Sequence, residues 1–354
     1  MTTIKMEDIL PMLGISYDTL RNGTINIPCP QCDSGKGRHL NIDLVKDVFR
    51  CPKCGWSGGV FDLYAYYTGL PRKGIRSVIL ARLGTEDCPI VKKPKIEIVP
   101  EMPQTDIDTR DQTYRALLNK LTLASDHRDN LRKRGLSDDL IDSLGYKTTP
   151  VIGMSLISKQ LIKEGLYLAG VPGFYRQDDG SWTLRMEKRG IMIPVKDSGG
   201  RIQGIQIRRD NTEKRKFRWL SSSGQVDGCA AKTWVHVAGA PSEIMLLTEG
   251  PMKADIIHAL SGYGVIAVPG VSSLGFLPDT LRKLKGMGLQ KIMTCFDMDM
   301  ICNPFVQDAQ KQLGALLEQE KFTFGTYFWN PAYKGLDDYL WAAAVKKGNL
   351  YGKH

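Results

Sequence analysis

The stretch Ile244-Met245-Leu246-Leu247-Thr248-Glu249-Gly250 decides the fold class of this chain of 354 residues. Its apolar run predicts a short buried strand, and Pro251 suits the first turn of a helical pattern that continues to Leu260. Further patterns follow: an apolar run from Gly264, a helix over about Pro278–Lys285 and a strand over Lys291–Phe296. Strands that alternate with helices predict a parallel, doubly wound α/β sheet.

Acidic residues follow these predicted strands, and one more pair follows the apolar stretch Phe322–Trp329. They are Glu249, Asp297, Asp299, Asp337 and Asp338. Ligands of doubly wound sheets bind beyond the carboxyl ends of the strands, so we expect these acids to converge. Because Mg²⁺ prefers carboxylate oxygens and substrate phosphate, the cluster suits one or two Mg²⁺ or Mn²⁺ ions. Taken singly, each acid has the simpler interpretation of a solvated turn residue.

The order of the acidic motifs resembles the Toprim domain of primases and topoisomerases. A strand precedes Glu-Gly and a helix, a second strand precedes Asp-x-Asp, and Lys-Gly-x-Asp-Asp follows, all between about Pro241 and Ala344. The resemblance implies that Glu249 is either a metal ligand or a proton-transfer group. Primases of the bacterial type carry a further acid soon after Glu-Gly, whereas this chain has Lys253 and then Asp255. Lys253 is therefore a candidate phosphate contact, and the role of Asp255 stays open.

A second motif lies near the amino end, where Cys29, Cys32, Cys51 and Cys54 form the pattern C-x2-C-x18-C-x2-C. This spacing predicts a closed, tetrahedral zinc site of four thiolates, which is structural rather than catalytic. Two disulfides or four unrelated thiols are the alternatives. The sequence shows no signal peptide and no transmembrane run, which favours a reducing cytoplasm in which disulfides are rare.

The residues around the last two cysteines resemble the zinc ribbon of DNA primases. Alternating apolar residues between Arg38 and Phe49 predict a hairpin, and a helical pattern follows Cys54 and ends near Gly69. In such a ribbon, Phe49, Arg50 and Trp56 are candidates for stacking on or gripping a single-stranded template. Packing in the core is the alternative for the two aromatic residues.

A dense basic run lies in the middle of the chain: Arg208, Arg209, Lys214, Arg215, Lys216 and Arg218. It is interrupted at Asp210-Asn211, where we expect a hairpin turn. Because alternate residues of a strand share a face, Lys216 and Arg218 are predicted to grip phosphate together, while Phe217 and Trp219 pack. A solvated charged face is the alternative. The formal net charge of +10 favours a polyanionic partner.

Three segments, Leu131–Tyr146, Arg189–Arg208 and Lys216–Ser221, resemble the catalytic core of the same primases. The resemblance implies that Arg208 and Arg218 occupy basic positions of the active-site cleft, and Arg209 and Lys216 are further candidates for nucleotide or template binding. Two departures are present. The usual glycine pair before the first arginine is Gln206-Ile207, and the usual lysine of the third segment is Arg218.

Together these patterns predict a multi-domain α/β protein. The expected parts are a zinc ribbon (1–84), a linker (85–110), an α+β basic subdomain (111–240) and a Toprim domain with a Rossmann-like parallel sheet (241–354). The resemblance to bacterial and phage-type DNA primases implies magnesium-dependent synthesis of short RNA primers on single-stranded DNA from nucleoside triphosphates. The alternatives are a Toprim nuclease or topoisomerase, and a non-catalytic, single-strand-binding initiation protein.

Other features bear on the partners. The sequence contains no G-x-x-x-x-G-K-[ST] motif, so we expect no P-loop motor within it. By analogy with primases we expect a separate replicative helicase and an origin in phage or mobile-element replication. No long amphipathic basic helix or lipidation signal indicates a membrane partner.

Overall fold

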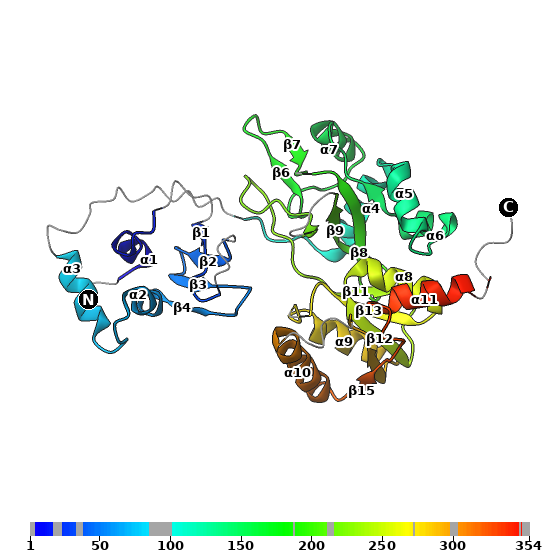
Figure 1. Ribbon diagram of the computed structural model, residues 1–354. Coiled ribbons are helices and arrows are strands. Elements are labelled where there is room, and N and C mark those ends of the chain that lie inside the picture. The colour runs from blue at the N-terminus through cyan, green and yellow to red at the C-terminus, as the bar shows by residue number, and fades with distance from the viewer. Residues whose placement is uncertain are drawn as a thin grey trace. The chain divides into compact units, whose positions relative to one another are not determined.

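The computed structural model describes residues 4–16, 23–32, 38–84, 101–186, 188–210, 216–271, 273–297, 304–346 and 348. Within 304–308 only the backbone is described. The chain divides into two compact units, Met1–Pro100 and Glu101–His354 (Figure 1). Within the described ranges, no helix has the length and apolar character needed to cross a membrane.

The first unit is built on a small antiparallel sheet in the order β1-β2-β3-β4. Its strands are β1 (Thr24–Ile27), β2 (Leu40–Asp43), β3 (Val48–Arg50) and β4 (Ser57–Gly59), and its helical elements are α1 (Met6–Ile9), η1 (Pro11–Leu13), α2 (Val60–Thr68) and α3 (Ile75–Leu83). The hairpin β2-β3 and the helix α2 confirm two predictions made from the sequence. Apolar side chains of the sheet, such as Ile42 and Phe49, pack with Leu63 and Tyr64 of α2 in one core.

The second unit begins with an antiparallel sheet in the order β10-β9-β8-β5. Its strands are β5 (Lys147–Thr148), β8 (Gly190–Lys196), β9 (Ile202–Arg209) and β10 (Phe217–Trp219), with a separate hairpin of β6 (Phe174–Arg176) and β7 (Trp182–Leu184). The helices of this part are α4 (Ile107–Asn119), α5 (Ser125–Arg132), α6 (Asp138–Leu144) and α7 (Met154–Lys163). Ser137 caps the amino end of α6, because its hydroxyl accepts a hydrogen bond from the Leu140 amide at 3.4 Å.

The remaining residues of the second unit form a five-stranded sheet in the order β11-β13-β12-β14-β15. Its strands are β11 (His236–Ala238), β12 (Ile244–Glu249), β13 (Gly264–Val268), β14 (Lys291–Thr294) and β15 (Thr323–Thr326). β12 to β15 run parallel and only β11 is antiparallel, so the predicted parallel sheet is confirmed with one edge strand reversed. The helices are α8 (Pro251–Ser261), α9 (Leu277–Gly286), α10 (Pro304–Gln319) and α11 (Leu336–Lys346).

Helices cover both faces of this parallel sheet (Figure 1). Met245 and Leu247 of β12 pack in the core that includes α9 and α10, whereas Leu246 packs in the core that includes α8 and α11. Successive side chains of a strand point to opposite faces, so an unbroken apolar run is what a sheet covered on both sides requires. This doubly wound arrangement leaves the carboxyl ends of β12 and β14 available for a site.

The antiparallel and parallel parts of the second unit share a core. Leu131, Tyr146 and Ile191 pack against Met252 and Ile256 of α8. The fold class predicted from the sequence, a mixed α/β multi-domain protein with an amino-terminal cysteine site, is confirmed. The finer division at residues 240 and 241 falls inside this compact unit and stays a prediction.

The predicted linker, residues 85–110, lies partly outside the described residues. Residues 101–110 belong to the second unit: the Met102 amide donates to the Gly228 carbonyl at 2.8 Å, and the Thr105 amide donates to the Gly170 carbonyl at 3.0 Å. These hydrogen bonds tie the segment ahead of α4 to the antiparallel part.

Candidate active site

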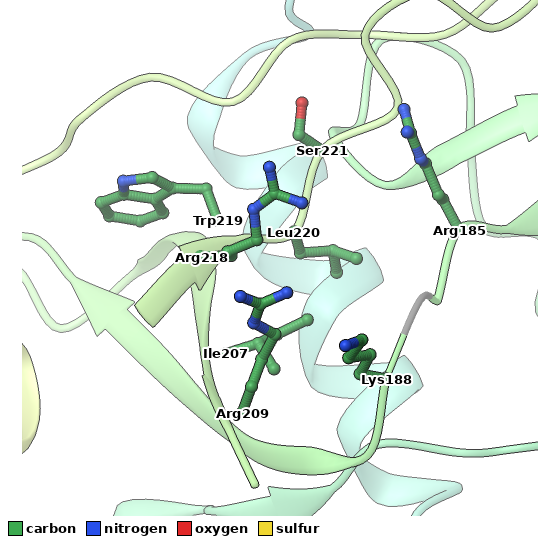
Figure 2. Close-up of a pocket in the computed structure, with 8 residues that line it drawn as sticks. All are labelled: Arg185, Lys188, Ile207, Arg209, Arg218, Trp219, Leu220 and Ser221. Atoms are coloured by element: carbon green, nitrogen blue, oxygen red, sulfur yellow. The ribbon is translucent and has the colours of Figure 1, made fainter. Parts of the chain in front are cut away.

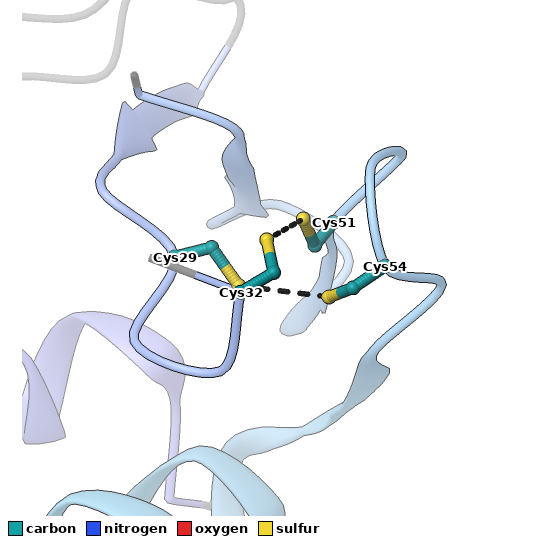
Figure 3. A group of neighbouring side chains, drawn as sticks. All are labelled: Cys29, Cys32, Cys51 and Cys54. Carbon is teal, nitrogen blue, oxygen red and sulfur yellow. Dashed lines mark hydrogen bonds between the residues drawn. The ribbon is translucent and has the colours of Figure 1, made fainter. Parts of the chain in front are cut away.

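The four cysteines of the amino-terminal motif lie together in the first unit (Figure 3). Their sulfur atoms all lie within 4.8 Å of one another, with Cys29 and Cys54 3.8 Å apart and Cys32 and Cys51 3.6 Å apart. Tetrahedral zinc with Zn–S bonds of about 2.3 Å separates its sulfurs by about 3.8 Å, whereas a disulfide requires about 2.05 Å. The geometry therefore fits a structural zinc ion and excludes the alternative of two disulfides.

The aromatic residues beside the zinc site pack against each other. Phe49 is buried, its ring centroid lies 4.5 Å from that of Trp56, and Trp56 lies 4.6 Å from Tyr66. Arg50 is exposed. Phe49 therefore serves the core, and Arg50 remains a candidate for contact with nucleic acid.

In the second unit, the carboxyl ends of β12 and β14 open into a cleft of about 450 Å³. We call it the acidic cleft. Its lining combines acids and bases from both sheets: Arg134, Gln206, Arg208, Lys216, Phe217, Glu249, Gly250, Met252, Lys253, Pro269, Asp297, Lys334, Asp337 and Asp338. Four of the five acids predicted from the sequence thus meet in one cavity, while Asp299 lies outside the described residues.

Glu249 and Asp297 reach the cleft from neighbouring parallel strands. Gly250 follows Glu249 with φ of +81°, a conformation that favours glycine, and so lets β12 turn at once into α8. Nζ of Lys253 lies 3.5 Å from Oε1 of Glu249 and 2.5 Å from Oδ1 of Asp297. The second oxygen of Asp297, Oδ2, lies 3.8 Å from Nζ of Lys334.

Asp337 is the most deeply placed acid of the Lys-Gly-x-Asp-Asp motif. Asp337 is 6% exposed and Asp297 is 8% exposed, and within the described part of the chain Oδ1 of Asp337 has no hydrogen-bond partner. A Cβ at Gly335 would lie 2.3 Å from that oxygen and 3.2 Å from Oδ1 of Asp297, so a larger residue there would have to displace the Asp337 carboxylate. A buried carboxylate oxygen without a partner is costly unless a cation or a proton meets it, so Asp337 is a candidate ligand for a divalent metal.

The charges of the acids change the ionisation of the groups around them. Burial raises the pKa of Asp337, with further contributions from the negative charges of Asp338 and Asp297. Burial alone would lower the pKa of Lys253, but its hydrogen bond to Asp297 and the surrounding carboxylates outweigh that effect and raise it. Lys253 is therefore a permanent cation inside the cluster.

Asp255 has a different environment. It is buried, and its two oxygens accept hydrogen bonds from the Tyr146 hydroxyl at 2.6 Å and from Nε2 of His236 at 3.0 Å. Nδ1 of His236 accepts from the Lys196 amide at 2.9 Å, which places the imidazole proton on Nε2. Asp255 therefore joins α8 to the antiparallel part and does not line the acidic cleft.

The antiparallel part adds basic residues to the wall of the acidic cleft. Arg208 comes from β9, Lys216 precedes β10, and Arg134 follows α5. The positive charge of Arg208 is the main cause that lowers the pKa of Lys216, and burial lowers the pKa of Arg208 itself. Cations that repel one another in this way are relieved by a bound anion. Sequence reasoning gave Arg134 no role, although it lies in one of the segments that resemble primases.

Two of the predicted basic residues lie elsewhere. Arg209 and Arg218 line a second cavity of about 200 Å³ together with Arg185 and Lys188, which we call the basic cavity (Figure 2). Arg218 is paired with Ile207 in the β9-β10 register, and Phe217 with Arg208, so Arg218 and Arg208 point to opposite faces of the sheet.

The prediction that Lys216 and Arg218 share one face is wrong. β10 begins at Phe217, so Lys216 lies before the strand and alternation does not govern it. Lys216 lines the acidic cleft, whereas Arg218 lines the basic cavity. Lys214 and Arg215, the other members of the predicted basic run, lie outside the described residues.

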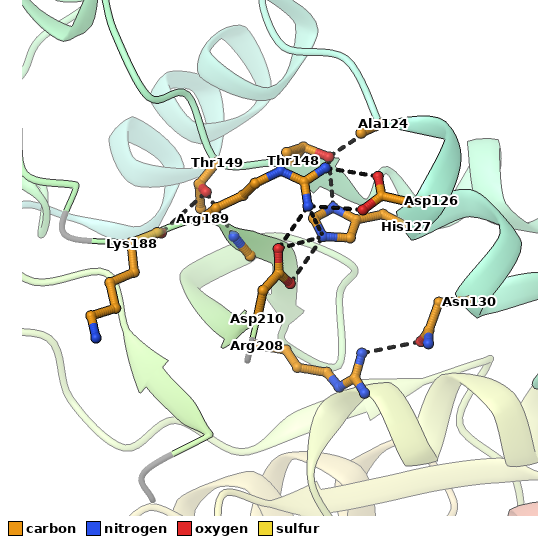
Figure 4. Close-up of polar contacts among 11 residues, drawn as sticks. Ala124, Asp126, His127, Asn130, Thr148, Thr149, Lys188, Arg189, Arg208 and Asp210 are labelled. Atoms are coloured by element: carbon orange, nitrogen blue, oxygen red, sulfur yellow. Dashed lines mark hydrogen bonds and ion pairs between the residues drawn. The ribbon is translucent and has the colours of Figure 1, made fainter. Parts of the chain in front are cut away.

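A polar network fixes the end of β9, next to Arg208 (Figure 4). Nε2 of the buried His127 lies 3.0 Å from Asp210, and Arg189 contacts Asp210 and Asp126, each at 2.8 Å. Arg208 itself donates to Oδ1 of Asn130 at 3.1 Å. Because His127, Asp126 and Asn130 all belong to α5, this helix positions the basic wall of the cleft.

Comparison with solved structures identifies the fold. The structure is similar to the crystal structure of the Aquifex aeolicus primase, comprising zinc-binding and RNA polymerase domains, with a TM-score of 0.52 and 15% sequence identity over 98% of this chain and 80% of that chain. The fold is that of a bacterial primase. The RNA polymerase domain of Mycobacterium tuberculosis primase DnaG is also similar, with a TM-score of 0.51 and 14% identity over 69% of this chain and 81% of that chain. The resemblance to primases seen in the sequence is confirmed at the level of the fold.

Comparison of the sequence with protein families and curated proteins does not indicate a function. A family model described as a domain of unknown function, DUF3854, matches residues 233–347, which span the elements from β11 to α11. No curated protein matches the sequence.

Proposed function

We propose that this protein is a DNA primase, which joins nucleoside triphosphates into short RNA primers on a single-stranded DNA template. One observation carries the proposal: the acids of the parallel sheet and the cations of the antiparallel sheet line the same cleft. A nucleotidyl transferase needs both, because carboxylates hold metal ions and cations neutralise the triphosphate. On this proposal residues 241–354 form a Toprim domain.

Glu249, Asp297, Asp337 and Asp338 would hold one or two magnesium ions, and the orphaned oxygen of Asp337 supports this assignment. When bound, magnesium would supply positive charge for activating the attacking 3′-hydroxyl and for stabilising the leaving pyrophosphate. Asp299 remains a proposed ligand from its place in the Asp-x-Asp motif. Glu249 is proposed as a ligand or as the group that accepts the hydroxyl proton.

The basic residues would position the substrates. Arg208, Lys216 and Arg134, which line the same cleft as the acids, would bind the triphosphate. Lys253 would orient Asp297 and contact phosphate. Arg218 and Arg209, with Arg185 and Lys188, would bind the backbone of the template strand at the basic cavity.

The zinc unit would contribute to template recognition, as the zinc-binding domain of a primase fold suggests. We propose a separate replicative helicase as partner and the reducing cytoplasm as the place of action, where four thiolates stay available for zinc. Both parts of the proposal rest on analogy and on the chemistry of cysteine.

The test is primer synthesis by the purified full chain on mixed single-stranded DNA templates with labelled ribonucleoside triphosphates, with and without Mg²⁺. Short RNA products that require both template and Mg²⁺ are expected. Tight DNA binding without any product would contradict the proposal and favour a binding protein. Cleavage of supercoiled DNA without nucleotides would instead favour a nuclease or topoisomerase.

A further inference from the structure

We infer that an aromatic cavity beside Asp297 binds the base of a nucleotide. This cavity, which we call the base cavity, has a volume of about 240 Å³ and lies between the carboxyl ends of β14 and β15 and helix α10. The inference rests on the proposed function, because it assigns the place of the base for a nucleotide whose phosphates lie in the acidic cleft.

The base cavity and the acidic cleft share one lining residue, Asp297. On the cleft side, Asp297 contacts the cations Lys253 and Lys334, which suit phosphate. A nucleotide spanning Asp297 would therefore place its charged end among cations and acids, and its uncharged end in the base cavity.

The lining of the base cavity suits a flat heterocycle. Five of the thirteen lining residues are aromatic, namely Phe296, Phe324, Tyr327, Phe328 and Trp329. Every nucleobase has an aromatic face, so stacking on such side chains binds bases with little dependence on their identity. Gln310 adds an amide and Thr326 a hydroxyl, which are groups that hydrogen-bond the edge of a base.

The aromatic residues of the base cavity differ in exposure, so some serve the core and others are open to a ligand. Trp329 is buried, and its Nε1 donates to the Tyr333 carbonyl at 3.0 Å. Phe324 is 38% exposed and Phe328 is 81% exposed, although both line the cavity. An exposed phenyl ring that lines a cavity gains most from a ligand that stacks on it, so Phe328 is the proposed stacking residue.

The size of the cavity points to a base rather than a whole nucleotide. Pockets that enclose drug-sized ligands are about 300–1,000 Å³, so a cavity of about 240 Å³ suits one ring system. The sugar and phosphates would then continue past Asp297 into the larger acidic cleft.

The experiment compares ATP with inorganic tripolyphosphate, measured by calorimetric titration of the full chain in Mg²⁺. Phe328→Ala should weaken ATP binding about five- to a hundred-fold while leaving tripolyphosphate binding unchanged, since only ATP has a base. Phe328→Trp should restore ATP binding. The matched control is Tyr167→Ala, which removes another exposed aromatic residue that does not line the base cavity.

Three results would overturn the inference: equal ATP binding by the wild type and Phe328→Ala, equal loss of both ligands, or a wild type that binds ATP no more tightly than tripolyphosphate. These results are distinct from failure of the proposed function, which is absence of primer synthesis by the wild-type protein. A wild type that synthesises primers with ATP binding unaffected by Phe328→Ala would contradict this inference alone.

Discussion

Nζ of Lys253 lies 2.5 Å from Oδ1 of Asp297, so a lysine supplies one positive charge inside the acidic cluster. It occupies the part of the sequence where primases of the bacterial type carry an acid. Lys253 lies on the first turn of α8, four residues after Glu249, and also contacts that glutamate at 3.5 Å. Two carboxylates from different strands are therefore held together by one side chain.

Replacement of Lys253 by Met should destabilise the metal-free protein by up to about 3 kcal/mol, because it removes the cation from a largely buried ion pair. The same change should strengthen binding of Mn²⁺ to the cleft, since the ion no longer competes with the ammonium. Thermal unfolding with and without Mn²⁺ measures both effects. Lys334→Met is the matched control: this lysine contacts the same Asp297 at 3.8 Å but is 60% exposed, so we expect a cost below about 1 kcal/mol. Equal effects of the two variants would contradict the special role of Lys253.

Loss of a zinc ligand should affect the first unit alone. Cys51→Ser is expected to abolish zinc binding and to remove the cooperative unfolding of that unit, because a structural zinc ion contributes about 10–16 kcal/mol in small zinc-binding peptides. Metal analysis and calorimetry of the full chain would measure both effects. The matched control is Cys229→Ser, which changes a buried cysteine of the second unit. This variant should bind zinc as the wild type does. Zinc retained by Cys51→Ser would refute the site.

The buried network around Asp255 should be structural. Asp255→Asn leaves either the Tyr146 hydroxyl or His236 without its hydrogen-bond acceptor. The free energy of unfolding should therefore fall by about 1–3 kcal/mol. Affinity of the acidic cleft for Mn²⁺, measured by electron paramagnetic resonance, should stay unchanged. A large loss of Mn²⁺ affinity in a folded Asp255→Asn protein would show that this acid acts at the metal site after all.

Arg208 and Arg218 should act on different substrates because they point to opposite faces of the sheet. Arg208→Ala is expected to raise KM for nucleoside triphosphates without changing the salt dependence of DNA binding. Arg218→Ala should lower the slope of log affinity for single-stranded DNA against log salt by about 0.7, the value for one lost phosphate contact. Two measurements separate the effects of these variants: titration of a labelled oligonucleotide at several salt concentrations, and steady-state kinetics. The assignment fails if both variants change the same quantity.

Much of the parallel sheet was predictable from the sequence because its signals are local. Apolar runs that end in an acid, such as the run before Glu249, predict both a buried strand and the position of its carboxyl end. The topological rule that these ends meet at one edge then brings Asp297 to Glu249 without any knowledge of the structure. The pattern of four cysteines is local in the same sense.

The basic residues were harder to place because their positions depend on packing between distant segments. Arg185 and Lys188 belong to no motif, and only the fold brings them to Arg218. The alternation of side chains along a strand does not place Lys216, because β10 begins one residue later, at Phe217. The different environments of Lys253 and Asp255 could have been predicted from the sequence, because side chains two residues apart on a helix point about 200° apart.

The most direct test of the central claim is template-directed primer synthesis by Asp297→Ala, compared with the wild type and with Asp178→Ala, which removes an exposed acid outside the cleft. Asp297→Ala should fold, keep its zinc and lose essentially all RNA product, because its carboxylate links the proposed metal site to Lys253. Asp178→Ala should synthesise primers at the wild-type rate. Substantial primer synthesis by pure, zinc-loaded Asp297→Ala would contradict the assignment of the acidic cleft as the catalytic site.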